Sequence, residues 1–269
     1  MTLIQLTPLD LALSAILVLA LALLSLRLSL GIERRLLIAT LRTVIQLSLL
    51  GLVLKFLFVQ SHPLLIATLA LFMLFVAGYE VMARQQRHFL GIWGMGVGTL
   101  SMFISSFTVT LLALTIVIQA EPWYSVQYLI PLLGMLLGNT MSGIAIALDH
   151  LTHNAWQQRR EIEAQLILGH YWDQAIRDIR RSALRSGLIP IINAMAAAGV
   201  VSLPGMMTGQ ILAGAPPLEA SKYQILIMLL IAAGTGFGAT AAVWIGSKRL
   251  FDERERLRLD RLSPVKAGA

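Results

Sequence analysis

Seven long apolar runs dominate the sequence and restrict what this chain can fold into. They cover approximately residues 9–26, 36–58, 64–81, 89–118, 128–148, 188–213 and 223–245. A helix that crosses the hydrocarbon core of a bilayer needs ~20 such residues. Of all residues, 57% are hydrophobic and 13% are charged, whereas soluble domains carry about 25% charged residues. The sequence therefore predicts an all-α, polytopic membrane protein with about seven transmembrane helices in a single domain over residues 1–269.

Basic residues alternate between the connections, and this alternation predicts the topology. Of the 21 lysines and arginines, only Lys55 and Lys222 lie near one predicted face, which leaves 19 at the other. The positive-inside rule makes the arginine-rich face cytoplasmic. We therefore expect an external N-terminus, a retained first span and a cytoplasmic C-terminus. The mixed-charge tail over residues 247–269 then lies in the cytoplasm, where we expect a short helical extension.

The net charge of +7 does not indicate a nucleic-acid partner. The basic residues gather at predicted membrane boundaries, so we expect lipid rather than nucleic acid beside them. The chain contains no cysteine. Disulfides, thiolate metal ligands and a cysteine nucleophile are therefore excluded.

A charged amphipathic segment, at about residues 154–187, leads directly into the sixth apolar run. Apolar side chains recur along it at helical spacing, at Ile162, Leu166, Trp172, Ile176, Ile179 and Ala183, and charged side chains occupy much of the remaining circumference. An amphipathic helix buries its apolar face against a partner. The sequence leaves open whether that partner is a lipid headgroup layer, another part of this chain or another protein.

Small residues form seams on two of the runs. Gly94, Gly98, Ser101 and Ser105 are spaced three or four residues apart in the fourth run, and Gly234 and Gly238 begin a similar series in the seventh. Such seams let the backbone of a neighbouring helix come close, so we expect them to serve helix packing. For the fourth run, a hydroxyl-lined pathway is the alternative interpretation.

Two asparagines lie within the predicted membrane, Asn139 in the fifth run and Asn193 in the sixth. An amide that faces lipid is costly, so we expect Asn139 to face the protein interior. It would there form an interhelical hydrogen bond or contact a substrate.

The sixth run contains residues that break helices. Proline removes one intrahelical hydrogen bond and clashes with the preceding turn, so we expect interruptions at Pro190 and near Pro204-Gly205. Unwound backbone at membrane depth is tolerated only inside protein or beside water, which makes the second break a candidate gate. Met206 and Met207 follow it; thioethers suit monovalent copper, but methionine also fills gaps in cores.

The sequence can be tested for three kinds of site: a phosphate-binding loop, a serine protease site and a metal site. The four lysines lack the Gly-x-x-x-x-Gly-Lys-Ser/Thr context of a phosphate-binding loop, so this chain does not hydrolyse nucleotide by that route. A serine protease would need a base near Ser142, yet all five histidines lie at or beyond the predicted interfaces. Asp149, His150 and His153 form the one candidate metal site, since Asp149 and His153 share a helix face. We expect no catalytic residue and no cofactor bound by this chain.

One motif in the amphipathic segment points to a transport partner. Glu163-Ala164-Gln165-x-x-x-Gly169 resembles the Glu-Ala-Ala-x-x-x-Gly cytoplasmic motif of ABC importer membrane subunits, which docks into a cleft on the ATPase. Gly169 suits the turn of this motif because glycine accepts the positive φ that ends a helix. The chain departs from the pattern at Gln165.

A longer resemblance covers the chain in length and span pattern. Its specific motifs are Gly138-Asn139-x-Met141, Leu168-Gly169, Ile189-Pro190, residues 201–209 (VSLPGMMTG), Ala213-Gly214 and residues 222–225 (KYQI). Together these resemble the FetB-type iron-export permease family, which also includes plant aluminium-resistance half-transporters. The resemblance implies a permease subunit in a bacterial inner membrane, working as a homodimer with a separate cytoplasmic ATPase that binds ATP and Mg. It also implies a metal ion, such as iron, as substrate.

On this hypothesis, motion of the ATPase passes through Glu163, Ala164 and Gly169, then through Arg181 and Arg185. It opens or closes a path near Asn139, Asn193 and the break that includes Pro204. Two alternatives are a secondary transporter driven by an ion gradient and a membrane scaffold that transports nothing. A secondary transporter would want a carboxylate near mid-membrane, and the nearest, Glu80, lies at the cytoplasmic end of its run.

Overall fold

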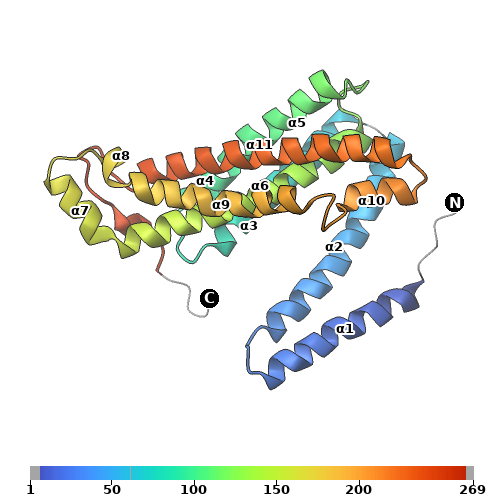
Figure 1. Ribbon diagram of the computed structural model, residues 1–269, viewed down its shortest axis with the longest axis horizontal. Helices are drawn as coiled ribbons and strands as arrows, with labels where there is room; N and C mark the ends of the chain where they lie inside the picture. The colour runs from blue at the N-terminus through green and yellow to red at the C-terminus, as the bar shows by residue number, and fades with distance from the viewer. Residues whose placement is uncertain (1–6, 61, 265–269) are drawn as a thin grey trace. The chain divides into compact units, whose positions relative to one another are not determined.

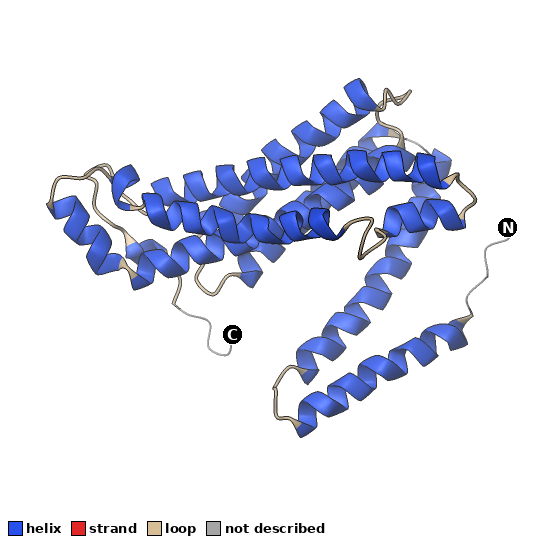
Figure 2. Cartoon of the chain, viewed as in Figure 1, coloured by secondary structure: helices blue, strands red, loops and turns tan. Residues whose placement is uncertain are grey.

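The structure is a computed structural model that describes residues 7–60 and 62–264. Most of the described residues are helical, and no strand occurs among them (Figures 1 and 2). The longer helices are α1 (Pro8–Arg27), α2 (Glu33–Gln60), α3 (Pro63–Arg84), α4 (Ile92–Met102), α6 (Val126–Gln157), α9 (Arg177–Ala197) and α11 (Pro217–Arg249). The shorter elements are α5 (Thr108–Leu112), α7 (Arg159–Ile167), α8 (Trp172–Ala175), α10 (Gly205–Leu212), two π-helical turns, η1 (Phe103–Phe107) and η2 (Ala113–Val117), and a 3₁₀ turn, η3 (Leu259–Arg261). The predicted all-α class is confirmed.

Six helical stretches in the described residues are long and apolar enough to cross a membrane, judged by length and composition. They coincide with six of the seven predicted runs. The remaining run, residues 188–213, is divided between the end of α9 and α10, and residues 198–204 belong to neither helix. The sequence left open whether this run is one kinked span or two half-helices, and the structure gives two helices.

The break in the sixth run begins earlier than Pro204. α9 ends at Ala197, and a tight turn follows in which Gly199 has a φ of +79° and its N–H donates to the carbonyl of Ser202. The expected interruption at Pro190 is wrong, because α9 continues through that residue. Proline removes a single hydrogen bond, and the flanking turns of a helix can carry the remaining ones.

The chain forms two compact units. The first comprises residues 1–62 with 212–214, and its described part contains α1 and α2. The first helix begins with a capping box, in which Asp10 accepts a hydrogen bond from the Thr7 N–H while Pro8 occupies the first turn. Ser25 on α1 is buried and its hydroxyl donates to Glu33 at the start of α2, 3.1 Å away.

The second unit comprises residues 63–211 and 215–269 and is organised around α6. This helix packs against α3, α9 and α11, and α4 with its π-helical continuation also contacts α11 and α6 (Figure 1). Core side chains of α6 lie on its inward face, including Leu133, Leu137, Ile144, Leu148 and Leu151. This unit therefore contains the hydrophobic core and every site discussed below.

Glycines lie where helices of this unit approach most closely. α6 and α9 meet at Gly143 and Gly187, where a Cβ on Gly187 would lie 2.6 Å from the Gly143 carbonyl oxygen. The glycines assigned to packing from sequence also lie in helix contacts: Gly98 against Val81, Gly234 against Leu136, and Gly238 against Ser105 and Thr140. Gly94 lies against Met82 of α3 and against the Phe89 carbonyl in the connection between α3 and α4. Ser101 and Ser105 are buried on the same helix as Gly94 and Gly98.

Candidate functional site

The segment between α6 and α9 forms a short helical hairpin at the end of the second unit that the topology prediction places in the cytoplasm. α7 leaves the end of α6, a turn over residues 168–171 reverses the chain, and α8 leads directly into α9 (Figure 1). Because α9 continues without a break to Ala197, the hairpin is joined to the helix that ends at the break in the sixth run. A displacement of the hairpin is therefore transmitted along one continuous helix.

The apolar stripe of the segment is buried within the same chain. Ile162, Ile176 and Ala183 are at most 1% exposed and belong to the main core, with Leu166 and Trp172 packed beside them. This answers the question that the sequence left open, because the partner of the stripe is the rest of this chain. The headgroup layer is excluded as its partner in this structure.

The turn itself presents apolar side chains outward. Ile167, Leu168 and Tyr171, here called the tip, are 86%, 77% and 66% exposed. Large apolar groups on a water-facing turn are unfavourable unless something covers them. The tip is therefore the part of the segment that is available to a partner protein.

Gly169 sets the geometry of the turn. Its φ is +90°, and nothing lies within 4 Å of the place where a Cβ would stand. The His170 N–H donates to the Gln165 carbonyl and the Gly169 N–H to that of Leu166, which together form a Schellman motif. Backbone conformation, and not lack of space, is what requires glycine here.

The other residues assigned to ATPase coupling lie on exposed surfaces of the segment. Glu163 and Ala164 are exposed on α7, and no hydrogen bond or ion pair joins Glu163 to another described residue. Arg181 and Arg185 are exposed on α9, where Arg181 lies 3.9 Å from Asp178, itself almost fully exposed. Such a pair contributes little to folding, so these charges remain available to a partner.

The described part of the C-terminal tail, up to Pro264, packs against the hairpin. The expected helical extension is wrong: α11 ends at Arg249, and the Asp252 carboxylate then accepts the backbone N–H groups of Arg254 and Arg256, which fixes a turn in place of a further helical one. The Glu255 carboxylate accepts the Trp172 N–H at 2.6 Å, at the start of α8. Phe251 is buried with its ring centroid 5.8 Å from that of Trp172.

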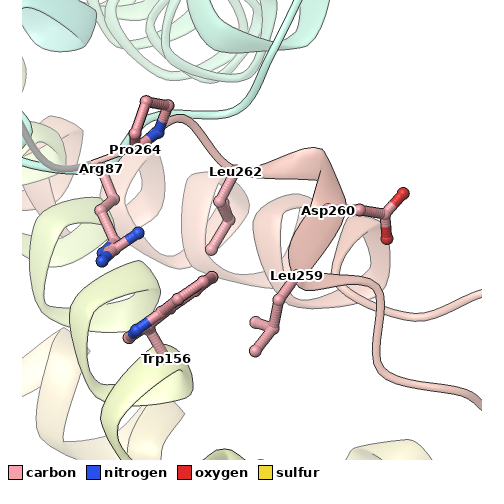
Figure 3. Close-up of a pocket in the computed structure, with 6 residues that line it drawn as sticks. All are labelled: Arg87, Trp156, Leu259, Asp260, Leu262 and Pro264. Atoms are coloured by element: carbon pink, nitrogen blue, oxygen red, sulfur yellow. The ribbon is translucent and has the colours of Figure 1, made fainter.

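The tail also binds the connection between α3 and α4. The Ser263 N–H donates to the His88 carbonyl, the Leu90 N–H donates to that of Arg261, and the Ser263 hydroxyl lies 2.7 Å from His88 Nδ1. Next to this contact the Arg87 guanidinium lies over the Trp156 ring, 3.9 Å from its centroid (Figure 3). A recess of 520 Å³ is lined by Arg87, Trp156, Leu259, Asp260, Leu262 and Pro264. The tail thus contacts both the hairpin and the connection between α3 and α4.

Charges within the tail stabilise its turn at neutral pH. The backbone N–H of Arg256 is the main cause that lowers the pKa of Asp252 to about 2, and a hydrogen bond from the Arg258 side chain lowers the pKa of Asp260. A carboxylate whose pKa is lowered by folding stabilises the folded form at any pH above the pKa that it has in the unfolded chain, 3.8 for Asp252. This contribution of Asp252 is therefore lost only as the pH falls from about 3.8 towards 2.

Removing the Glu255 carboxylate is expected to loosen the α7–α8 turn. The Glu255→Gln variant loses a charge-assisted hydrogen bond, and such bonds contribute roughly 1.5 kcal/mol or more. The Trp172 amide should then exchange with solvent deuterium about tenfold faster. Glu253→Gln is the matched control, because Glu253 is exposed and has no partner among the described residues. Equal exchange rates in the two variants would show that the tail does not hold the turn.

The two asparagines lie on the surface of the chain. We expected Asn139 to face the interior, but it is exposed on α6 and its amide donates to the Met135 carbonyl of its own helix at 2.8 Å. Asn193 is exposed on α9. Within the second unit the prediction of an interior position is therefore wrong, because the neighbouring helices of this unit leave one surface of α6 uncovered.

One residue next to the break in the sixth run lines a partly polar cavity. Pro204 precedes α10 and Gly205 begins it; Met206 lines a cavity of 390 Å³ with Met135, Gln210 and others, whereas Pro204, Gly205 and Met207 do not. The carbonyl oxygen of the Gln210 side chain is buried there without a hydrogen-bond partner among the described residues. Thioethers of two helices and an amide thus share one cavity.

The structure does not bring Asp149, His150 and His153 together as metal ligands. Asp149 accepts the Gln86 N–H at 2.7 Å, and His150 Nδ1 lies 3.2 Å from the Ser186 hydroxyl. No group of three His, Cys, Asp or Glu residues that could hold a metal ion occurs in the described part of the chain. The side chains of Asp149 and His150 instead contact the residues after α3 and the helix α9, respectively.

Sequence reasoning missed the residues by which the tail holds the hairpin, chiefly Glu255 and Phe251, and Ser263, which binds the connection between α3 and α4. The available signal was the recurrence of apolar residues, such as Leu257 and Leu262, inside a charged segment. It also missed the tip, because exposure of Ile167 and Tyr171 depends on which face of the hairpin the core covers.

The fold and the site define a helical membrane protein with several apolar spans and a short hairpin that carries an exposed apolar tip. Residues 8–251 match the family described as "Uncharacterised protein family (UPF0014)", and the chain belongs to this family. No solved structure matches the chain.

Three relatives show the range of the family. The chain is 40% identical over 220 residues to "UPF0014 membrane protein slr1647" of Synechocystis sp., covering 80% of this chain and 83% of the relative. It is 29% identical over 262 residues to the "Probable iron export permease protein FetB" of Escherichia coli, covering 94% and 95%. It is 34% identical over 225 residues to "Protein ALUMINUM SENSITIVE 3" of Arabidopsis thaliana, covering 83% and 80%. The predicted resemblance to FetB-type permeases is confirmed.

Proposed function

We propose that this chain is the membrane-spanning permease subunit of an ABC transporter that exports iron or another metal ion, in a bacterial inner membrane. A separate cytoplasmic ATPase, which binds ATP and Mg, supplies the energy. The observation that carries the proposal is the exposed apolar tip on a hairpin whose other apolar side chains are buried. The name of the Escherichia coli relative, an iron export permease, supports the substrate class.

The hairpin suits a coupling element for physical reasons. Its base is held by the core and by the tail, so a force on the tip moves the hairpin as one body rather than bending it. Glu163 and Arg181 remain exposed beside the tip and can form ion pairs with a partner. Closure of two ATPase subunits would move the tip, and α9 would carry this motion to the break over residues 198–204.

A second copy of the chain completes the transporter. Asn139 and the half-buried Ser142 form a polar stripe on the uncovered side of α6, here called the outer stripe, and His150 lies further along the helix at the predicted interface. Polar side chains at membrane depth avoid lipid and face protein or water. A homodimer that places two outer stripes opposite each other meets this requirement. The path then runs between the copies, beside Asn139 and Asn193, towards Pro204, Gly205, Met206 and Met207.

The secondary-transporter alternative lacks a suitable carboxylate. Glu80, the nearest candidate, lies 3.8 Å from Arg84 at the end of α3, and its side chain is 18% exposed. A carboxylate that carries an ion across a membrane has to lose and regain its partner near mid-membrane. The position of this pair therefore favours transport driven by an ATPase.

The test is reconstitution of the full chain in liposomes with and without its ATPase. We expect ATP-dependent movement of iron by the wild-type complex and none by the permease alone. Glu163→Lys should abolish the ATP-dependent movement while the protein remains folded, because the exposed carboxylate contributes nothing to the core. Glu161→Lys, on the same helix and also exposed, is the control. Iron movement by the permease alone, driven by an ion gradient, would refute the proposal.

A further inference from the structure

Hydroxyl side chains gather in the contact between three helices of the second unit. They are Ser101 on α4, Ser105 and Ser106 on η1, Thr140 on α6 and Thr235 on α11, here called the inner seam. The inner seam and the outer stripe lie on different sides of α6, since Thr140 is fully buried and Asn139 is exposed. The inner seam is formed within a single chain.

All five hydroxyls are buried and unpaired. Each residue is at most 4% exposed, and none of the five oxygens has a hydrogen-bond partner among the described residues. By contrast, Thr110, one turn further along the same helix, donates to the Ser106 carbonyl at 2.6 Å. An unsatisfied buried hydroxyl loses the hydrogen bonds it makes in water and gains none in return. Five such groups in one contact make the closed packing costly.

Two of these residues, Ser105 and Thr140, lie against glycines of α11. A Cβ on Gly238 would lie 2.7 Å from Ser105 Oγ and 2.7 Å from Thr140 Cγ2, and a Cβ on Gly234 would lie 3.6 Å from Thr140 Oγ1. Thr235 of α11 lies against Gly143 of α6, where an added Cβ would lie 2.5 Å from Thr235 Cγ2. The three helices are therefore in direct contact here, and only their separation would admit water.

The helix that carries the serines is not a regular α-helix. Two π-helical turns, η1 and η2, interrupt it on either side of α5, and η1 contains Ser105 and Ser106. Such turns are uncommon and occur often at functional sites. They also change the register of the side chains along this helix, so the serines do not follow the regular α-helical spacing.

We propose that the inner seam opens to water during the transport cycle and forms a second polar route, inside each chain, for a small cation that prefers oxygen ligands. This inference rests on the proposed function. In the open arrangement the hydroxyls regain the hydrogen bonds that they lack when closed, and this offsets part of the cost of separating the helices. α9 packs against both α6 and α11, so the motion that reaches α9 from the hairpin also reaches the seam.

The chemistry of the seam selects among metal ions. Its polar atoms are hydroxyl oxygens, and its described residues contain no sulfur or imidazole ligand. Oxygen ligands suit hard cations, whereas thioethers and thiolates suit soft ones. The seam should therefore pass trivalent iron or aluminium in preference to monovalent copper, which would favour the thioethers near Met206.

Single cysteines provide the first test, since the natural chain has none. Ser105→Cys and Thr140→Cys are near-isosteric and place a thiol in the seam. In membrane vesicles from cells that express the protein with its own partners, we expect a small, charged, thiol-reactive methanethiosulfonate to modify both positions. The rate should rise about tenfold when ATP is added, because the reagent needs water to reach a thiolate.

The controls are Val97→Cys and Val243→Cys, on α4 and α11. Both positions are 1% exposed, and valine and cysteine have similar volumes. Modification of the seam positions at the control rate, with or without ATP, would overturn the proposal. The same result combined with rapid modification of Asn139→Cys would place the route between the two copies alone.

The Thr140→Val variant provides a second test that does not depend on labelling. Valine has the shape of threonine without the hydroxyl, so removing an unpaired buried hydroxyl is expected to raise the unfolding temperature. Transport of trivalent iron should nevertheless fall about tenfold if the seam carries the ion. A more stable variant that transports at the wild-type rate would show that the hydroxyls are only packing groups. Absence of ATP-dependent transport by the wild type would instead refute the proposed function, while the labelling rates would still decide whether the seam opens.

Discussion

Gly143→Ala is expected to destabilise the protein strongly, although alanine is the better helix former. The added Cβ would lie 2.5 Å from Thr235 Cγ2 and 3.0 Å from the Gly187 carbonyl oxygen. The carbonyl belongs to the backbone of α9 and cannot rotate away, so α6 and α9 have to separate along their length. Overpacking of this kind costs about 3 kcal/mol, a large part of the stability of a typical domain. The yield and unfolding temperature of purified protein measure the effect.

Gly138→Ala, on the same helix, is expected to have the opposite effect. Nothing lies within 4 Å of a Cβ on Gly138. Replacing glycine by alanine in a helix interior then gains about 0.5–1 kcal/mol through lower entropy of the unfolded chain. Equal unfolding temperatures for the two variants would contradict the close contact between α6 and α9.

The secondary structure follows closely from the sequence because local rules decide it. Apolar runs of spanning length became helices, and the positive φ at Gly169 reflects the single residue type that accepts it at no cost. The end of α7 needed no information from elsewhere in the chain, since its Schellman hydrogen bonds join residues within one turn.

Contacts between distant segments did not follow from the sequence. The apolar face of the segment from 154 to 187 looked the same whether lipid, protein or its own chain covered it, and the structure covers it with the core and the tail. The sequence predicted that the tail forms a mixed-charge helix. In the structure, Asp252 ends the helical pattern because its carboxylate accepts the backbone N–H groups two and four residues later. What covers the apolar face depends on partners that are far apart in sequence, whereas the turn at Asp252 is a local competition between a side chain and the helical backbone pattern.

In the sixth run, the apolar pattern alone did not predict where the helix ends. Its composition predicted a span, but the structure ends α9 at Ala197, where a turn through Gly199 is available before Pro204. A proline inside a helix also costs stability in water, yet Pro190 leaves α9 continuous. Glycine with a positive φ changes the direction of the chain, whereas a proline removes one bond from a ladder that its neighbours maintain.

Gly169→Val is expected to uncouple ATP hydrolysis from metal export while leaving the membrane part folded. The φ of +90° is a strained conformation for any side chain and worst for a β-branched one, although the surrounding space is empty. The turn should therefore change its backbone conformation and reorient Leu168 and Tyr171, whereas the buried base of the hairpin is held by Ile162 and Ile176. We expect transport by the reconstituted complex to fall about tenfold or more, with an unchanged unfolding temperature of the permease.

The Gly169→Asn variant tests whether the loss of transport is caused by backbone strain or by the absence of glycine itself. Asparagine adopts positive φ values far more readily than valine, and the empty space around residue 169 admits its side chain. The asparagine variant should therefore retain most of the transport, since the tip keeps its orientation. If valine and asparagine reduced transport equally, the turn geometry would not be what couples the two proteins, and the side chains of α7, with Glu163 foremost, would have to carry the coupling alone.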